Sequence, residues 1–317
     1  MAHMTNPLAT AEQLYQRNNL SSLPNDLQDV ILYVTQSLTQ AAGVLLQLPQ
    51  SATAQANVIL ARYWLAESRP LLTTEFSDVS AACVFLASKL GSRARSPRDI
   101  SNVYAYLLSN SSSFMRSKGT QPPVEDPSSY YLSDADYFAF HNRVLALEAR
   151  ILYTLSFDTH VALPHPLAVT YLQTLDFCNQ PKERISRRTI EYLNTALLSP
   201  QLLYLTHQPN MLAVAAIYNA AKDVGAKMPE CEWWEVFDVE REELGFLVVA
   251  MRSLEGWVNK QREELPWMAD GMVTRKAVQT ELLTRGIHNG NGGQVEDEEA
   301  AMMIQMDRTM DQADSRS

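Results

Sequence analysis

The residues best suited to chemistry are spaced in ways that argue against catalysis. The sequence contains no glycine-rich phosphate loop, no G-x-S-x-G motif and no H-E-x-x-H motif. His160 and His165 lie five residues apart across a proline-containing hinge, which is a poor geometry for two ligands of one metal ion. Acidic pairs are frequent, but none falls in a predicted cleft. We therefore expect no catalytic residue, no metal site and no cofactor, and a protein that is not an enzyme.

The cysteines and the paired tryptophans also favour structural roles. Cys83, Cys178 and Cys231 are too far apart for a zinc site or a disulfide framework, which indicates a reducing compartment. Cys83 falls in an apolar stretch and is expected in the core. Trp233 and Trp234 are expected to anchor a hydrophobic core rather than stack on a nucleic-acid base.

Composition predicts a helical globular protein. The chain has 317 residues, of which 46% are hydrophobic and only 11 are glycine. The net charge is −10, and about half of the acidic excess lies in residues 289–317. Because the rest is only mildly acidic, we expect no direct nucleic-acid binding. The sequence has no signal-peptide pattern and no apolar run near 18 residues, so no membrane association is expected either.

Apolar residues recur at helical spacing in two series, one before and one after Pro164. Residues 109–133, which are rich in serine and proline, predict a long surface loop within the first series. The first series predicts helices at about 26–48, 51–69, 74–89, 97–108 and 134–155, with Asp26 and Ser51 as caps of the first two. The second predicts helices at about 167–175, 185–198, 209–221 and 239–260, with a short piece near Trp233.

The third helix of each series has a similar sequence. Residues 82–89 align with residues 215–222 at a constant offset of 133, and both segments are small, apolar and end in lysine. Any two buried alanine-rich helices look alike, but the matched position in two series favours duplication. The fold class predicted is all-α, with two five-helix bundles in tandem, each around a central buried helix.

Two segments resemble the cyclin box. Residues 85–89, Phe-Leu-Ala-Ser-Lys, resemble the end of the third helix of a first cyclin box, and residues 148–158 resemble its fifth helix, with the pattern E-x-x-[IV]-L-x-x-L-x-F. Residues 41–50 and 164–173 resemble L-type cyclins, which act in transcription and RNA processing. The resemblance covers about residues 25–260 and implies a first cyclin box at 25–160 and a second at 161–260.

The two ends of the chain lie outside the resemblance. Residues 1–24 form an N-terminal extension, for which a mobile lead-in and a docking helix are equally good interpretations. Residues 261–317 are expected to form an acidic, largely disordered tail, with a partner-binding helix around residues 296–310 as the alternative.

The resemblance implies a surface that binds the C helix of a cyclin-dependent kinase. By position, Lys89 and Glu148 are the two residues that come together there, with Leu152 and Phe157 as an apolar floor and Leu90 at its edge. A lysine can reach backbone carbonyls at a helix end, and a glutamate accepts bonds from backbone N–H groups. Arg93, Arg95 and Arg98 form either a patch that faces the kinase's activation-loop region or a solvated loop. (The acidic pair that often follows the lysine in cyclins is replaced here by Gly91 and Ser92.)

The implied function is a nuclear regulatory subunit that allosterically activates a kinase of the PITSLRE type in transcription and pre-mRNA splicing. Splicing or transcription factors are further candidate partners. Cyclins of the K, T, C and H types, which activate kinases of the RNA polymerase II C-terminal domain, remain alternatives. So does a non-kinase role as a cyclin-fold transcription factor or scaffold, although a TFIIB-type factor would need a zinc ribbon and basic helices that the sequence lacks. The arginine–serine tail and the hydrophobic substrate-docking motif of other cyclins are also missing.

Overall fold

The computed structural model describes residues 4–19, 23–67, 71–109, 112, 127–177, 183–265, 268 and 273–287. It divides into two compact units, Met1–Arg275 and Lys276–Ser317. Throughout the described residues the regular structure is helical, as predicted. Cys178, most of the loop at 109–133 and the acidic segment at 289–317 lie outside them.

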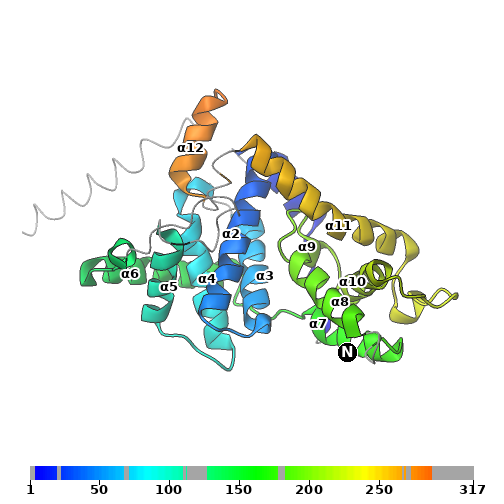
Figure 1. The fold of residues 1–317 in the computed structure, drawn as a ribbon. Helices are drawn as coiled ribbons and strands as arrows, with labels where there is room; N and C mark the ends of the chain where they lie inside the picture. Colours follow the sequence, from blue (N-terminus) through cyan, green and yellow to red (C-terminus); the bar gives the residue numbers. More distant parts are fainter. Residues whose placement is uncertain are drawn as a thin grey trace, which may run out of the picture. The chain divides into compact units, whose positions relative to one another are not determined.

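The first series forms five helices, which Figure 1 shows grouped together. An additional helix, α1 (Ala11–Asn19), precedes them within the N-terminal extension. The five are α2 (Asn25–Leu45), α3 (Gln50–Ala66), α4 (Phe76–Leu90), α5 (Pro97–Leu108) and α6 (Asp134–Thr154), with short 3-10 turns η2 (Leu71–Thr73) and η3 (Pro127–Tyr130) in the connections.

The second series follows in the same compact unit. The connection between α6 and the next helix contains the predicted box boundary at residues 160–161. The elements are α7 (Pro164–Thr174), α8 (Glu183–Ala196), α9 (Leu203–Thr206), α10 (Pro209–Val224), the 3-10 turn η4 (Glu235–Phe237) and α11 (Arg241–Glu264). A further described helix, α12 (Arg275–Thr284), begins at the boundary with the second compact unit and was not predicted.

Helices α4 and α10 are the centres of the two series, which confirms the predicted architecture. Helix α4 contacts α2, α3, α5 and α6, whereas α10 contacts α7, α8, α9, α11 and η4. Both are buried on nearly every side because alanine, serine and other small residues let their neighbours approach closely. Cys83 is fully buried in α4, and Trp233 packs beside Phe237 in the second core, as the sequence predicts.

A chain of hydroxyl groups crosses the first core. Ser80 Oγ of α4 lies 2.7 Å from Thr39 Oγ1 of α2 and 2.6 Å from the hydroxyl oxygen of Tyr104 of α5. All three residues are fully buried, at 0% exposure. Thr39 Oγ1 also donates to the carbonyl of Thr35 at 2.9 Å, so the three hydroxyls can bond in series and link three helices.

Several helix ends differ from the predictions. Helix α2 begins after Pro24 instead of at a cap by Asp26, whose carboxylate instead lies in the first turn, where the helix dipole favours it. Helix α3 begins after Pro49 rather than after Ser51, and α11 runs from Arg241 to Glu264 rather than from 239 to 260. At α2 and α3 a proline occupies the N-cap position without a side-chain hydrogen bond, and the helix begins with the next residue.

Candidate functional site

Lys89 and Glu148, which the sequence places 59 residues apart, form an ion pair between α4 and α6. Lys89 Nζ lies 2.6 Å from Oε1 and 2.7 Å from Oε2 of Glu148. The lysine side chain is 40% exposed and the glutamate side chain 11% exposed. The ammonium also lies 3.9 Å from the ring centroid of Phe85, one turn earlier in α4. The two predicted residues are therefore adjacent, and the lysine is open to solvent.

Apolar side chains surround this pair at the surface. Leu90, next to Lys89, is 49% exposed, and Leu145, three residues before Glu148 in α6, is 40% exposed. Leu152 follows one turn after Glu148 and is half-buried against the core. Because positions 145, 148 and 152 lie on one face of a helix, these groups form a continuous stripe along α6.

Phe157 ends this stripe beyond α6. It is 61% exposed, and its ring packs edge to face with that of Tyr153 at a centroid separation of 5.4 Å. Tyr153 is itself 73% exposed. The sequence prediction missed Tyr153, although its position four residues before Phe157 in a helix–turn is a signal for such a contact. We call Lys89, Leu90, Glu148, Leu152, Tyr153 and Phe157 the α4–α6 surface.

The turn that carries Phe157 has a specific backbone cause. The N–H of Phe157 donates to the carbonyl of Leu152, and the N–H of Ser156 donates to that of Tyr153. These two bonds make a Schellman motif, in which Ser156 adopts the left-handed conformation at φ 50°. Phe157 follows at φ 62°, a conformation that costs a bulky residue of the order of 1 kcal/mol or more.

The same motif recurs at the end of α7 and shows what is unusual about Phe157. There the N–H of Phe177 donates to the carbonyl of Leu172, and Asp176 is left-handed at φ 54°. Phe177, however, is only 3% exposed. The sequence L-x-T-L-x-F is therefore used twice, once with the phenylalanine in the core and once with it facing solvent.

Two of the three arginines after α4 make contacts with other residues of the chain. Arg95 donates from its backbone N–H to Ser88 Oγ and from its guanidinium to the carbonyl of Gln47. Arg98 lies 3.7 Å from Asp134 and stacks over the ring of Tyr137 at the start of α6. Arg93 is exposed. Arg95 and Arg98 thus contact different elements, and the three arginines do not share a common partner among the described residues.

Two further ion pairs join α6 to the rest of the first series. Arg143 Nε lies 2.8 Å from Oδ2 of Asp78, whose side chain is 6% exposed. Arg150 Nε lies 2.7 Å from Glu67 Oε2, which also accepts a bond from the hydroxyl of Tyr63. Burial, together with this bond, raises the pKa of Tyr63 and keeps its hydroxyl protonated. These contacts hold α6, and hence the α4–α6 surface, against α3 and α4.

The described part of the chain meets the requirements of neither a metal site nor a membrane-spanning helix. No group of three or more His, Cys, Asp or Glu residues there is arranged to hold a metal ion. His165 instead shares a 3.0 Å hydrogen bond with Oδ1 of Asn194. None of the described helices is both long enough and apolar enough to cross a membrane.

Comparison with known proteins identifies the class. No family model matches the chain. The chain is 31% identical to human Cyclin-L2 over 268 residues, which cover 80% of this chain and 48% of that protein. It is 33% identical to human Cyclin-L1 over 208 residues, covering 65% of this chain and 36% of that protein. A cyclin-L1-like protein of Schizosaccharomyces pombe is 33% identical over 214 residues, which cover 68% of this chain and 78% of that protein.

Solved structures share the fold at low sequence identity. The crystal structure of the yeast RNA polymerase II CTD kinase complex CTDK-1 matches with a TM-score of 0.60 at 15% identity, covering 81% of this chain and 74% of that chain. The CAK complex of Chaetomium thermophilum matches with a TM-score of 0.52 at 13% identity, covering 86% and 81%.

The tandem helical series, with α4 and α10 at their centres, is thus the fold of a cyclin, and the chain belongs to the cyclin family. Within that family it is most like the L-type cyclins. The chain spans about half the length, or less, of the human relatives that it matches.

Proposed function

We propose that this cyclin is a nuclear regulatory subunit that binds and activates a cyclin-dependent kinase of the PITSLRE type in transcription and pre-mRNA splicing. The similarity to Cyclin-L1 and Cyclin-L2 supports the class of activator. The similar folds of chains in two kinase complexes support a kinase as the partner. In this proposal the cyclin supplies binding energy and no catalytic group.

The observation that carries the proposal is the α4–α6 surface. A solvent-accessible lysine paired with a largely buried glutamate lies among Leu90, Leu152 and Phe157, of which two are about half exposed or more. Lys89 has a free face toward solvent from which it can donate to carbonyls at the end of a partner helix. The apolar side chains around it can bury that helix. This combination suits the docking of a helix better than it suits a small molecule or a nucleic acid.

The activation mechanism follows from differential binding. A kinase needs its C helix turned inward so that a glutamate on that helix can pair with the lysine that holds the ATP phosphates. A cyclin that binds the inward position more tightly than the outward one shifts the population toward the active kinase. In this arrangement the first series does the docking, and the second series supports it or binds a further partner.

The test is co-purification of the double variant Lys89→Ala, Glu148→Ala. We expect the variant to lose the kinase because it removes both polar contacts at the centre of the surface. Arg187→Ala, Glu191→Ala is the matched control, since it removes exposed ion pairs on α8: the Arg187 and Glu191 side chains are 85% and 45% exposed, and Glu191 also pairs with Arg188. Circular dichroism establishes that both variants are folded. Undiminished kinase recovery with the α4–α6 double variant would refute the proposal.

Mass spectrometry of the recovered partner identifies which kinase the cyclin binds. A PITSLRE-type kinase supports the L-type assignment in full. A kinase of the RNA polymerase II C-terminal domain instead would point to the activity of the K, T, C or H types. Recovery of splicing or transcription factors without any kinase would favour a cyclin-fold scaffold.

A further inference from the structure

The N-terminal extension contributes a segment, Asn6–Ala9, that is fastened between the two helical series. Asn6 is 6% exposed, and its side-chain amide both donates to the carbonyl and accepts from the N–H of Ala162, each at 2.8 Å. The backbone N–H and carbonyl of Asn6 bond Gln208 at 3.0 Å each. The N–H of Ala9 donates to the carbonyl of Leu205 at 2.7 Å. We call Asn6–Ala9 the N-terminal strap.

The strap is joined to the chain that follows Phe157. Arg62 of α3 donates to the carbonyl of His160 at 2.7 Å and to Asn6 Oδ1 at 3.3 Å. Gln55, also on α3, donates to the carbonyl of Thr159 at 3.0 Å. Side chains of α3 and of the strap therefore bond three residues of the linker that follows the Phe157 turn, namely Thr159, His160 and Ala162.

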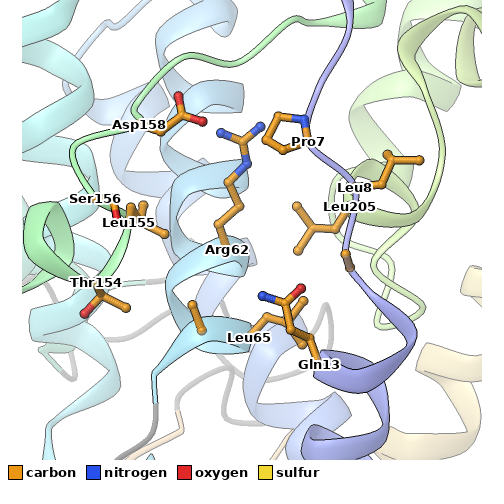
Figure 2. A pocket seen from close by; sticks show the side chains of 12 residues that line it. Pro7, Leu8, Gln13, Arg62, Leu65, Thr154, Leu155, Ser156, Asp158 and Leu205 are labelled. Atoms are coloured by element: carbon orange, nitrogen blue, oxygen red, sulfur yellow. The ribbon is translucent and has the colours of Figure 1, made fainter.

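A pocket of about 220 Å³ lies between the strap and this turn, as Figure 2 shows. Its walls come from the strap and α1, α3, the end of α6 and α9. Leu8, Leu65, Leu155 and Leu205 supply much of the apolar lining. An apolar cavity of about 150 Å³ is large enough for benzene. The pocket therefore has room for an aromatic ring or a leucine side chain, while it is smaller than the roughly 300 Å³ at which small-molecule sites begin.

The charges at the rim argue against an anionic ligand. The Arg62 guanidinium is bonded to two oxygen acceptors, and Asp158 lies close enough to oppose, by its charge, the lowering of the Arg62 pKa by burial. Figure 2 shows Asp158 on the side of the pocket toward which the Arg62 guanidinium extends. A rim with one positive and one negative group favours a neutral group with an apolar body over a phosphate or a carboxylate.

The pocket continues the α4–α6 surface. Leu155 lines the pocket, and it comes seven residues after Glu148, which places it on the same face two turns further on. At about 1.5 Å per residue this is roughly 10 Å, which a single partner segment can span. Leu152 lies between the two and makes the apolar path continuous.

We propose that this pocket is a second anchor of the kinase-docking surface, in which the strap captures a large apolar side chain of the kinase segment next to its docked helix. The proposal rests on the kinase-activator function proposed above. The strap has a structural reason to be part of the surface, since without Pro7, Leu8 and Ala9 the pocket would lose one wall. The N-terminal extension would thus contribute to kinase affinity although it lies far in sequence from Lys89 and Glu148.

The test fills the pocket without disturbing the strap. Ala66 is an exposed residue at the end of α3 that lines the pocket, so Ala66→Phe places a ring in it at little risk to the core. The affinity of a purified PITSLRE-type kinase is measured by titration. We expect Ala66→Phe to weaken binding about tenfold or more, because it blocks the burial of one large side chain. Ala66→Ser is the matched control and is expected to bind as the unaltered chain does.

A second pocket variant, compared with the double variant Lys89→Ala, Glu148→Ala, distinguishes the anchor-pocket proposal from the kinase-activator proposal. Leu8→Asn leaves the Asn6 bonds in place and removes one apolar wall, so it too should weaken binding while thermal unfolding is unchanged. If Ala66→Phe and Leu8→Asn bind normally while Lys89→Ala, Glu148→Ala does not bind, the anchor pocket is wrong and the kinase-activator proposal stands. If all three bind normally, both are wrong.

Discussion

Asp78, in the first turn of α4, is only 5% exposed, and its carboxylate accepts a hydrogen bond from an arginine of another helix. Arg143 reaches it at 2.8 Å, although the arginine side chain itself is 55% exposed. A buried carboxylate that loses such a partner keeps the cost of its desolvation. Removing Arg143 should therefore destabilise the fold mainly because it leaves a buried carboxylate unpaired, and less because the attraction between the two charges is lost.

We predict that Arg143→Ala lowers the free energy of unfolding by about 1–3 kcal/mol, since it strands the carboxylate of Asp78. Arg187→Ala, which removes an ion-pair partner on α8 whose side chain is 85% exposed, should cost about 0.5 kcal/mol or less. Urea denaturation of both variants measures the difference. Equal stabilities of the two variants would contradict the role assigned to Asp78.

At this scale the sequence predicted the centre of the candidate site but not its border. Lys89 and Glu148 could be paired because both sit in recognisable motifs. Asn6 and Arg62 could not, because their bonds join residues 156 and 98 positions apart and no local pattern records such contacts. Tyr153 lay within the motif, but its exposure depends on how α6 packs, which periodicity alone does not give.

The crossing of α2 and α3 illustrates how one helix constrains another. A Cβ added to Gly43 of α2 would lie 2.3 Å from Oγ1 and 2.5 Å from Cγ2 of Thr53 in α3. No real Cβ contact is that short, so this glycine allows the close approach of the two helices. The final turn of α2 is a Schellman motif, in which Leu48 donates to the carbonyl of Gly43 and Gln47 is left-handed at φ 52°.

We predict that Gly43→Ala destabilises the protein by about 1–3 kcal/mol, because overpacking outweighs the gain of about 1 kcal/mol in helix propensity. Thermal unfolding monitored by circular dichroism measures the loss. The double variant Gly43→Ala, Thr53→Ala is the decisive control, since it removes the atoms that clash. A double variant no more stable than Gly43→Ala would show that the crossing does not depend on this contact.

Helix existence was easier to predict than helix ends. The long amphipathic helices α2, α6 and α11 follow from their periodicity, and Ser96 caps α5 through a reciprocal bond with Asp99, next to the predicted Pro97. The four-residue α9 was missed because one turn is too short to show a period. The helix α12 was missed because the acidic composition further along the chain led us to expect a disordered tail from residue 261 onward.

Two partly buried histidines, His165 and His207, couple the stability of the first compact unit to pH. His165 shares its hydrogen bond with Asn194, and His207 contacts Thr206 and stacks on Phe246. Burial lowers the pKa of both below their ordinary value of 6.5, although a hydrogen bond opposes the shift in each. The unfolded chain therefore takes up protons first as the pH falls through 6.5, and the folded state loses stability there.

We predict that the free energy of unfolding falls between about pH 7 and about pH 5.5, and that it falls less in His165→Gln, His207→Gln. Urea titrations at several pH values measure the slope. His141→Gln removes a histidine whose ring stacks on Tyr137 and serves as the control for the loss of a histidine alone. A slope unchanged by the double variant would contradict this assignment.

The duplication of the fold could be predicted from the sequence because both central helices are buried, and burial favours small and apolar residues in each. The alignment of residues 82–89 with 215–222 corresponds to equivalent positions at the ends of α4 and α10. The equivalence stops at the lysines. Lys89 is paired with Glu148, whereas Lys222 is exposed on α10. At this position, among the described residues, the first series thus has an ion pair and the second has none, although Asp223, next to Lys222, pairs with Arg188 and Arg252.

The two copies of L-x-T-L-x-F bear on how this chain has been selected. Phe177 is buried in the core, and this burial stabilises the fold. Folding alone is therefore sufficient to keep a phenylalanine at that position. Phe157 does not: it occupies a left-handed backbone conformation and faces solvent, where glycine or asparagine would be less strained. A lineage selected only for a stable fold would drift toward those residues at position 157. Under the proposed function, a contact with the kinase would give Phe157 the burial that the isolated chain does not provide.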